Sequence, residues 1–228
     1  AVQAAMHAFF EAPNLVDDLR VRLVRNLSPT KFVTSDNPAV LTTRCHLSWR
    51  RPLGVAPGMQ SAGAVGLLPL TPEILLLIFD PDVYHLEHQH GWMELKRAQD
   101  ADAFNQQQVL HCAANLYFRA WEDRTEVNEL ALRLAERRPD ELFHISYAVV
   151  HHGGADGDTI FKTNDKAAAK DQAAFIHMSR RTPVPMAWPS ILSWRRGGCA
   201  YDSRSGAGIV RKAMRVSGVD YEKLRLHV

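Results

Sequence analysis

The sequence lacks most of the features that mark membrane, secreted and disulfide-bonded proteins. Its longest unbroken apolar run, Ile74–Phe79, is far too short to cross a bilayer. Its three cysteines, Cys45, Cys112 and Cys199, are too few and too scattered for a disulfide framework. No basic, apolar and small-residue segment opens the sequence, so we expect no secretory signal. These absences predict a cytoplasmic protein that does not enter a membrane.

Motifs of several enzyme classes are also missing. The glycines at 197–198 and 206–208 lack the Lys-Ser/Thr pair that would complete a nucleotide-binding loop. There is no Gly-x-Ser-x-Gly turn for a hydrolase serine and no Cys-x-x-Cys pair for zinc. The residue types alone therefore do not indicate which reaction, if any, the protein performs.

What the sequence does contain is typical of a folded domain. It has 228 residues, 46% of them hydrophobic and 23% charged, which suits one domain, or one domain with an appendage, and argues against disorder. The formal net charge of +2 excludes an overall basic nucleic-acid binder. Residues 179–228 nevertheless carry ten Lys/Arg against three Asp/Glu, for a net +7. This basic stretch indicates either an anionic partner such as nucleic acid or an ordinary solvated surface.

The hydrophobic pattern predicts an α+β fold with a mostly antiparallel sheet and helices packed on one side. Alternation at 19–25 predicts a half-buried strand, and the apolar segments 65–70 and 73–79 predict buried strands. Further strands are expected at 32–33, 39–42 and 142–150, and helices at 1–11, 100–121, 125–138, 165–178 and 209–216. We divide the chain into an α+β core at 1–138 and an extension at 139–228 that carries the basic stretch and packs on the core.

Three short motifs follow one another in the first half of the chain: FVTSDNP at 32–38, LPLTPE at 68–73, and a predicted helix containing Asn105. Their order and spacing resemble those of a bacterial family of unknown function, domain of unknown function family 4238, over roughly residues 19–121. No activity is assigned to that family, so the resemblance implies positions rather than chemistry. Its members usually carry a His-x-x-Pro-like motif ahead of this region. We do not find that motif here and expect that an N-terminal segment or a partner chain is missing.

The same motifs contain the candidate site residues. Asn37 precedes Pro38 and is therefore pushed towards extended backbone, while Asp36 is suited to closing a turn. Asn105 lies at one end of an apolar helix stripe formed by Val109, Cys112 and Leu116, with Arg119 near the same face. A buried amide needs hydrogen-bond partners, and the turn at Asp36 is the natural source. The candidate catalytic residues are Asp36, Asn37 and Asn105, with Ser35 and Arg119 as substrate-binding residues.

Two functions are compatible with this set. The first is a hydrolase, such as a metal-dependent phosphodiesterase or nuclease, with Asp36 as a Mg²⁺ ligand or as a general base. The second is a non-catalytic binding or regulatory module in which an Asp36–Asn105 contact is a structural clasp. In the first, Asp36 takes part in the reaction. In the second, Asp36 contributes only to the stability of the fold.

Other candidates have simpler interpretations. His85, His88 and His90 fall close together, but surface histidines explain them better than a metal site does. Cys112 is expected to be a buried thiol, and His111 is expected to point outward. Trp188, Trp194 and Tyr201 lie among arginines. They fit packing of a proline-rich segment onto the body better than they fit stacking on single-stranded nucleic acid.

Overall fold

The computed structural model describes residues 15–45, 58–139, 143–151, 160–164, 173–180, 183–203 and 208–225. The helix expected at 1–11 lies outside these residues. The chain forms two compact units. Among the described residues, the first unit comprises those up to Arg138 together with those from Pro183 onward, and the second comprises those between.

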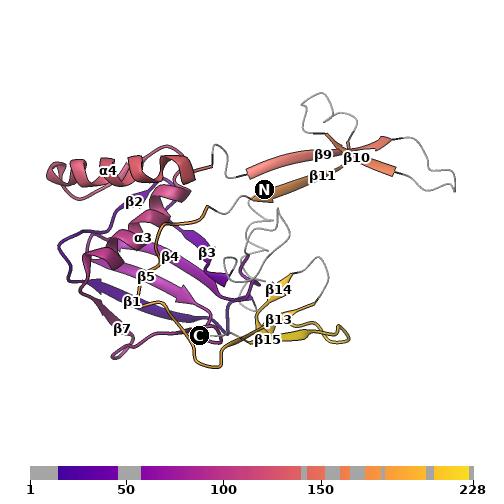
Figure 1. Cartoon of the computed structure of the whole chain (residues 1–228), viewed down its shortest axis with the longest axis horizontal. Coiled ribbons are helices and arrows are strands. Elements are labelled where there is room, and N and C mark those ends of the chain that lie inside the picture. Colours follow the sequence, from indigo (N-terminus) through magenta and orange to yellow (C-terminus); the bar gives the residue numbers. More distant parts are fainter. Residues whose placement is uncertain are drawn as a thin grey trace, which may run out of the picture. The chain divides into compact units, whose positions relative to one another are not determined.

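A five-stranded sheet organises the first unit (Figure 1). Its strand order is β3-β4-β5-β1-β7. Neighbouring strands are antiparallel except for β1 and β7, which are parallel, so the sheet is mixed. The strands are β1 (Arg20–Asn26), β3 (Val40–Thr43), β4 (Ala64–Thr71), β5 (Ile74–Phe79) and β7 (Trp92–Leu95). The α+β class is confirmed, while the packing of all helices on one side of the sheet stays a prediction.

The sheet fully buries one face, and the fully buried residues recur at every second position. Along β5 the buried residues are Leu75, Leu77 and Phe79. In the sheet register Leu75 lies opposite Val24 of β1, and Leu77 lies opposite Leu67 of β4. All of these residues are buried and belong to one core cluster, which is the expected result of a period-two pattern on a half-covered sheet.

Helix α3 (Ala98–His111) lies alongside the sheet, and α4 (Arg124–Leu134) lies alongside α3 (Figure 1). Phe104 of α3 packs edge-on against Phe32, with ring centroids 6.0 Å apart. The two helices contact each other through Val109, Leu110, Leu130 and Leu134. The expectation of one helix to residue 121 was wrong, because α3 ends at His111 and the chain continues into β8 (Leu116–Tyr117) and η2 (Trp121–Asp123).

Several short elements complete the first unit. β2 (Thr34–Ser35) pairs with β8, and β6 (Tyr84–His85) pairs with β12 (Ser193–Trp194). A three-stranded sheet has the order β14-β13-β15. Its strands are β13 (Cys199–Asp202), β14 (Ile209–Val210) and β15 (Glu222–Arg225). The helix expected at 209–216 is instead β14 followed by the short 3₁₀ turn η5 (Lys212–Met214), and another such turn, η3 (Ala135–Arg137), extends α4.

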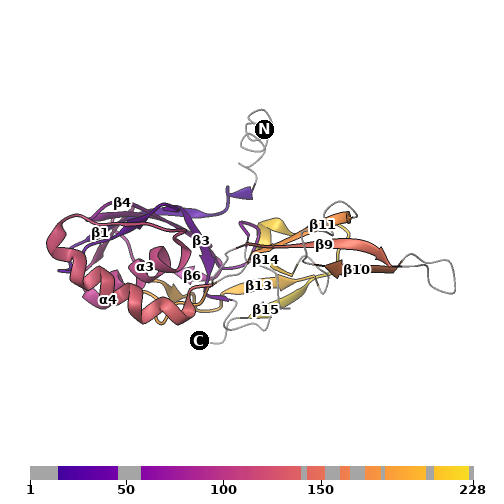
Figure 2. The same cartoon turned by 90° about the horizontal axis from the view of Figure 1, so that it is seen from above.

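The second unit is a three-stranded antiparallel sheet of order β10-β9-β11 (Figure 2). β9 (Phe143–His151) confirms the strand expected at 142–150. β10 (Ile160–Asn164) and β11 (Ala173–Arg180) flank it. The helix expected at 165–178 was wrong from Ala173 onward, because pairing with β9 overrides the helix propensity of the alanines there.

The segment from Pro183 onward is bound closely to the rest of the first unit. Trp194 stacks on Tyr84 with ring centroids 5.4 Å apart, and Trp188 packs against the core. Arg211, one residue of the basic stretch, is fully buried. It donates to the Met59 carbonyl at 2.9 Å and pairs with Asp18. Among the described residues, no helix is long and apolar enough to cross a membrane.

Asp80 is a buried carboxylate at the end of β5. It is 1% exposed and accepts N–H groups from Gly63 at 2.8 Å and Asp82 at 2.9 Å. Burial raises the pKa of Asp80 to about 6, and the two hydrogen bonds offset this only in part. The native state therefore holds this proton to a higher pH than the unfolded chain, for which the ordinary value is 3.8.

This shift predicts pH-dependent stability. The contribution of Asp80 is fully present below its unfolded pKa and is lost as pH rises through about 6. The shift corresponds to roughly 3 kcal/mol at most. We expect the difference in unfolding free energy between the wild type and Asp80→Asn to fall by about that amount between about pH 4 and about pH 7. Chemical denaturation at each pH measures it. A difference that does not change with pH contradicts the assignment, and Asp220→Asn, at an exposed site, serves as the matched control.

Candidate functional site

The Ser35–Asn37 turn lies beside the end of α3. β2 pairs with β8 so that Ser35 lies opposite Leu116, a few residues beyond the last turn of the helix. Pro38 restricts Asn37 to extended backbone, and the chain then enters β3. The β2–β8 pairing therefore places three consecutive polar side chains next to the C-terminal end of a helix.

Asp36 binds the backbone where α3 stops. Its Oδ1 accepts the Ala113 N–H at 2.8 Å, and its Oδ2 accepts those of Ala114 and Asn115 at 2.8 and 2.9 Å. A continuing helix would have used these donors for its own carbonyl groups, so Asp36 helps to determine where α3 ends. Desolvation opposes ionisation of Asp36, but the backbone hydrogen bonds together outweigh it and lower its pKa below 3.8. A carboxylate with a low pKa is a weak general base at neutral pH.

Ser35 and Asn37 also form hydrogen bonds with α3. The Asn37 amide donates to the His111 carbonyl at 3.1 Å. Ser35 donates through Oγ to Gln108 Oε1 at 3.0 Å, and Gln108 donates through Nε2 to the Pro38 carbonyl at 2.9 Å. The turn is thus joined to the last two turns of α3 on both sides.

Asn105 holds the segment that leads into this turn. Its Oδ1 accepts the Val33 N–H at 3.0 Å, and its Nδ2 donates to the Lys31 carbonyl at 2.8 Å. The amide therefore pairs with an extended backbone much as a neighbouring strand would, which meets the requirement that buried backbone groups be hydrogen-bonded. No direct hydrogen bond joins Asn105 to Asp36 among the described residues. The two residues hold different parts of one segment.

We call the five residues that hold the 31–38 segment to α3 the clasp: Ser35, Asp36, Asn37, Asn105 and Gln108. Sequence reasoning missed Gln108. Its position three residues after Asn105, on the same helix face, was the signal that could have found it. Two other expectations about this helix differ from the structure. Cys112 is buried as expected, but His111 is fully buried rather than outward.

Arg119 does not join the clasp. It follows β8 and pairs with Glu73 at 3.3 Å, with more than half of its side chain exposed. Arg119 and Asn105 both line a small cavity of about 20 Å³, which is about the space of one water molecule. Among the described residues, no group of three or more His, Cys, Asp or Glu side chains is arranged to hold a metal ion.

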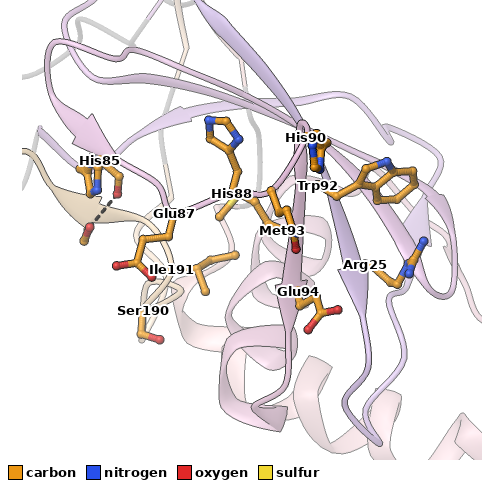
Figure 3. Close-up of a pocket in the computed structure, with 12 residues that line it drawn as sticks. Arg25, His85, Glu87, His88, His90, Trp92, Met93, Glu94, Ser190 and Ile191 are labelled. Atoms are coloured by element: carbon orange, nitrogen blue, oxygen red, sulfur yellow. Dashed lines mark hydrogen bonds between the residues drawn. The ribbon is translucent and has the colours of Figure 1, made fainter.

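A much larger hollow lies elsewhere in the first unit, around residues 85–94 (Figure 3). It encloses about 710 Å³, within the usual size range of ligand sites. We call it the histidine groove. Its walls come from β1, β6, β7 and the segment at 190–193, and the residues that line it are Arg25, His85, Glu87, His88, Gln89, His90, Trp92, Met93, Glu94, Ser190, Ile191 and Ser193.

A tight turn shapes one wall of the groove. Gln89 and Trp92 exchange two backbone hydrogen bonds of 2.9 Å across His90 and Gly91. Both central residues have positive φ, 51° for His90 and 85° for Gly91, as in the turns that match strand twist. His90, a non-glycine residue with positive φ, therefore lies in the wall of the groove. Strained backbone of this kind is concentrated at functional sites.

The opposite wall is fixed by buried contacts behind it. Ser190 donates both its N–H and its hydroxyl group to the buried carboxylate of Asp100, at 2.5 and 2.8 Å. Ser193 donates to the His85 carbonyl at 2.6 Å. Sequence reasoning treated His85, His88 and His90 as surface residues. These three histidines are exposed, as expected. The sequence did not predict the groove, because residues 190–193, which form its other wall, are far from residues 85–94 in the sequence.

Several polar side chains in the groove have no partner among the described residues. Glu87, Gln89 and His90 make no side-chain hydrogen bond or ion pair within the described part of the chain. His88 contacts Arg22 at 2.8 Å, and Glu94 pairs with Lys96 at 2.9 Å, which lowers the pKa of Glu94. The groove therefore presents hydrogen-bond donors and acceptors that the described part of the chain leaves unused.

The clasp geometry predicts a stability role for Asp36. We expect Asp36→Asn to lower the melting temperature by a few degrees, because an amide accepts through one oxygen where the carboxylate accepts through two. The contribution of the wild-type carboxylate is present above its ordinary pKa of 3.8 and is lost as pH falls through its lowered native value.

Thermal unfolding at neutral pH and in acid checks this prediction. The difference in melting temperature between the wild type and Asp36→Asn should disappear in acid. A difference in melting temperature that persists in acid, or no difference at neutral pH, contradicts the stability role of Asp36. Asp220→Asn is the control, because its side chain is exposed and makes no hydrogen bond or ion pair with the described residues.

Comparison with known proteins gives a family but no activity. No curated protein and no solved structure matches the chain. Residues 2–121, more than half of the chain and including the clasp and most of the groove, match the model of a family described as protein of unknown function (DUF4238). The chain belongs to that family.

Proposed function

We propose that this protein is a ligand-binding module, that the histidine groove is its binding site, and that the clasp is structural. One observation carries the proposal: Asp36, Asn105 and Gln108 of the clasp bond the protein's own backbone, whereas Glu87, Gln89 and His90 of the groove make no side-chain hydrogen bond or ion pair with the described residues. A ligand gains most from groups that have no partner to give up.

The clasp supports a structural role through the kind of partners that it has. Both carboxylate oxygens of Asp36 and both amide atoms of Asn105 bond backbone groups. Removing the Asn105 side chain leaves the buried Val33 N–H without its partner, at a cost of about 1–3 kcal/mol. The backbone groups that Asp36 binds are exposed to solvent, so its removal costs less. A ligand that displaced these contacts would have to replace them. Binding at the clasp is therefore unfavourable compared with binding in the groove.

The hydrolase hypothesis places its chemistry at Asp36 instead. A Mg²⁺ ion at Asp36 would share the carboxylate with three backbone donors and would find no second acidic ligand within the clasp. A nucleic-acid partner for the stretch 179–228 stays a separate prediction. Arg211 and Arg195 do not support it, because Arg211 is buried and Arg195 donates to the Pro81 carbonyl at 2.6 Å.

An NMR titration of the full chain tests where ligands bind. The probes are maltotetraose, myo-inositol, citrate, adenosine monophosphate and spermidine, which differ in charge and in hydrogen-bonding groups, and MgCl₂ is titrated separately. We expect at least one organic probe to shift the indole N–H resonance of Trp92 in a saturable manner. The resonance of Trp121, which is 69% exposed and does not line the groove, should not move.

Two results contradict the proposal. The first is that no probe shifts the Trp92 resonance. The second is that a probe or Mg²⁺ shifts the backbone amides of Ala113, Ala114 and Asn115 while Trp92 does not respond, which places the ligand at Asp36 and favours the hydrolase. The Trp92→Phe variant assigns the indole resonance.

A further inference from the structure

We infer that the ligand of the histidine groove is an uncharged, hydroxyl-rich molecule of the carbohydrate class. This inference rests on the proposed function, since it names the chemistry of the ligand for the same groove. It is carried by the charges, the hydrogen-bonding groups and the apolar surface that line the hollow.

The charges in the groove oppose a strongly charged ligand. Glu87 and Glu94 are acidic, and Arg25 is basic. A phosphate or polycarboxylate would meet the Glu87 carboxylate, which has no ion pair among the described residues, whereas Glu94 is paired with Lys96. A polyamine would meet the Arg25 guanidinium group. Burying a like charge opposite any of them is costly, so the walls discriminate against both kinds of ion. A neutral ligand meets no such penalty.

The hydrogen-bonding groups match hydroxyl groups instead. A hydroxyl group both donates and accepts, so one molecule that carries several of them can donate to Glu87 and accept from Arg25. Gln89 and His90 each offer a donor and an acceptor, and neither is engaged elsewhere among the described residues. A ring that bears several hydroxyl groups satisfies this mixture better than a molecule with acceptors only or donors only.

Apolar surface lies between these polar groups. Trp92, Met93 and Ile191 line the hollow together with the carboxylates (Figure 3). The Arg25 guanidinium group lies 5.0 Å from the centre of the Trp92 ring, which holds the ring in place by a cation–π contact. Sugar rings carry C–H groups between their hydroxyl groups, and this surface can cover them while the polar side chains bind the hydroxyl groups.

The walls are also fixed before any ligand arrives. The Gln89–Trp92 turn is closed by two backbone hydrogen bonds, and Ser190 is anchored to buried Asp100. A preformed site loses little conformational entropy on binding, which matters for a ligand that gives up many hydrogen bonds to water. At about 710 Å³ the hollow is large enough for more than one small ring.

Titration with maltotetraose, cellotetraose and chitotetraose, followed through the Trp92 indole resonance, tests the inference. We expect saturable binding of at least one of the three. We expect Glu87→Gln to raise its dissociation constant about tenfold, because a hydrogen bond to a charged group is lost. The control is Glu129→Gln, on the exposed face of α4, which should leave the constant unchanged.

The outcomes separate the two proposals. If citrate, adenosine monophosphate or spermidine shifts Trp92 and none of the three oligosaccharides does, the groove is a binding site and the carbohydrate inference is wrong. If no probe of any kind shifts Trp92, both are wrong. If an oligosaccharide binds with equal affinity to the wild type and Glu87→Gln, the assignment of Glu87 as a ligand-binding residue is overturned, and with it the hydrogen-bonding argument for the ligand class.

Discussion

The structure depends on the need to hydrogen-bond an extended backbone segment that pairs with a strand over only part of its length, at Thr34 and Ser35, and lies beside a helix. Residues 31–38 have α3 as their neighbour, and a helix offers no free backbone groups along its side. The side chains of Asn105 and Gln108 supply the missing partners. In turn, the Asp36 carboxylate accepts the backbone N–H groups that follow the helix. This exchange positions α3, ends it at His111 and turns the chain into β8.

The same physical rule separates the two candidate sites. A polar side chain that satisfies buried backbone groups is committed to the fold, and its removal is felt as lost stability. A polar side chain that faces an open hollow without a partner is available to a ligand. Asn105 belongs to the first kind. Asp36 binds backbone groups that are exposed, and Glu87 and Gln89 make no side-chain hydrogen bond with the described residues. In this structure the 31–38 segment is joined to the end of α3 by these side chains.

The segment from Pro183 to Trp194 links the two sites through α3. Gln106 accepts the N–H groups of Met186 and Ala187 at 2.8 and 3.2 Å, and Asp100 holds Ser190. α3 thus binds the 31–38 segment with one set of polar residues and the 186–190 segment with another. This explains why a helix beside the core has so many buried polar side chains, and it places Ile191 and Ser193 in the wall of the groove.

Local sequence determined the strands and the turn. The alternation along β1 and the apolar run of β5 each predict a strand, and Asn37-Pro38 predicts a turn, because these preferences act between neighbouring residues. The apolar run indicated burial of β5 on both faces, whereas the structure fully buries only every second residue. The sequence also marked Asp36, Asn37 and Asn105 as residues that need partners. Only the tertiary structure decided which partners they have. It ended α3 ten residues before the predicted end by diverting the N–H groups of Ala113–Asn115 to Asp36, and it made the groove by joining residues 85–94 to residues 190–193. Such contacts connect positions far apart in the chain, and no local pattern contains them.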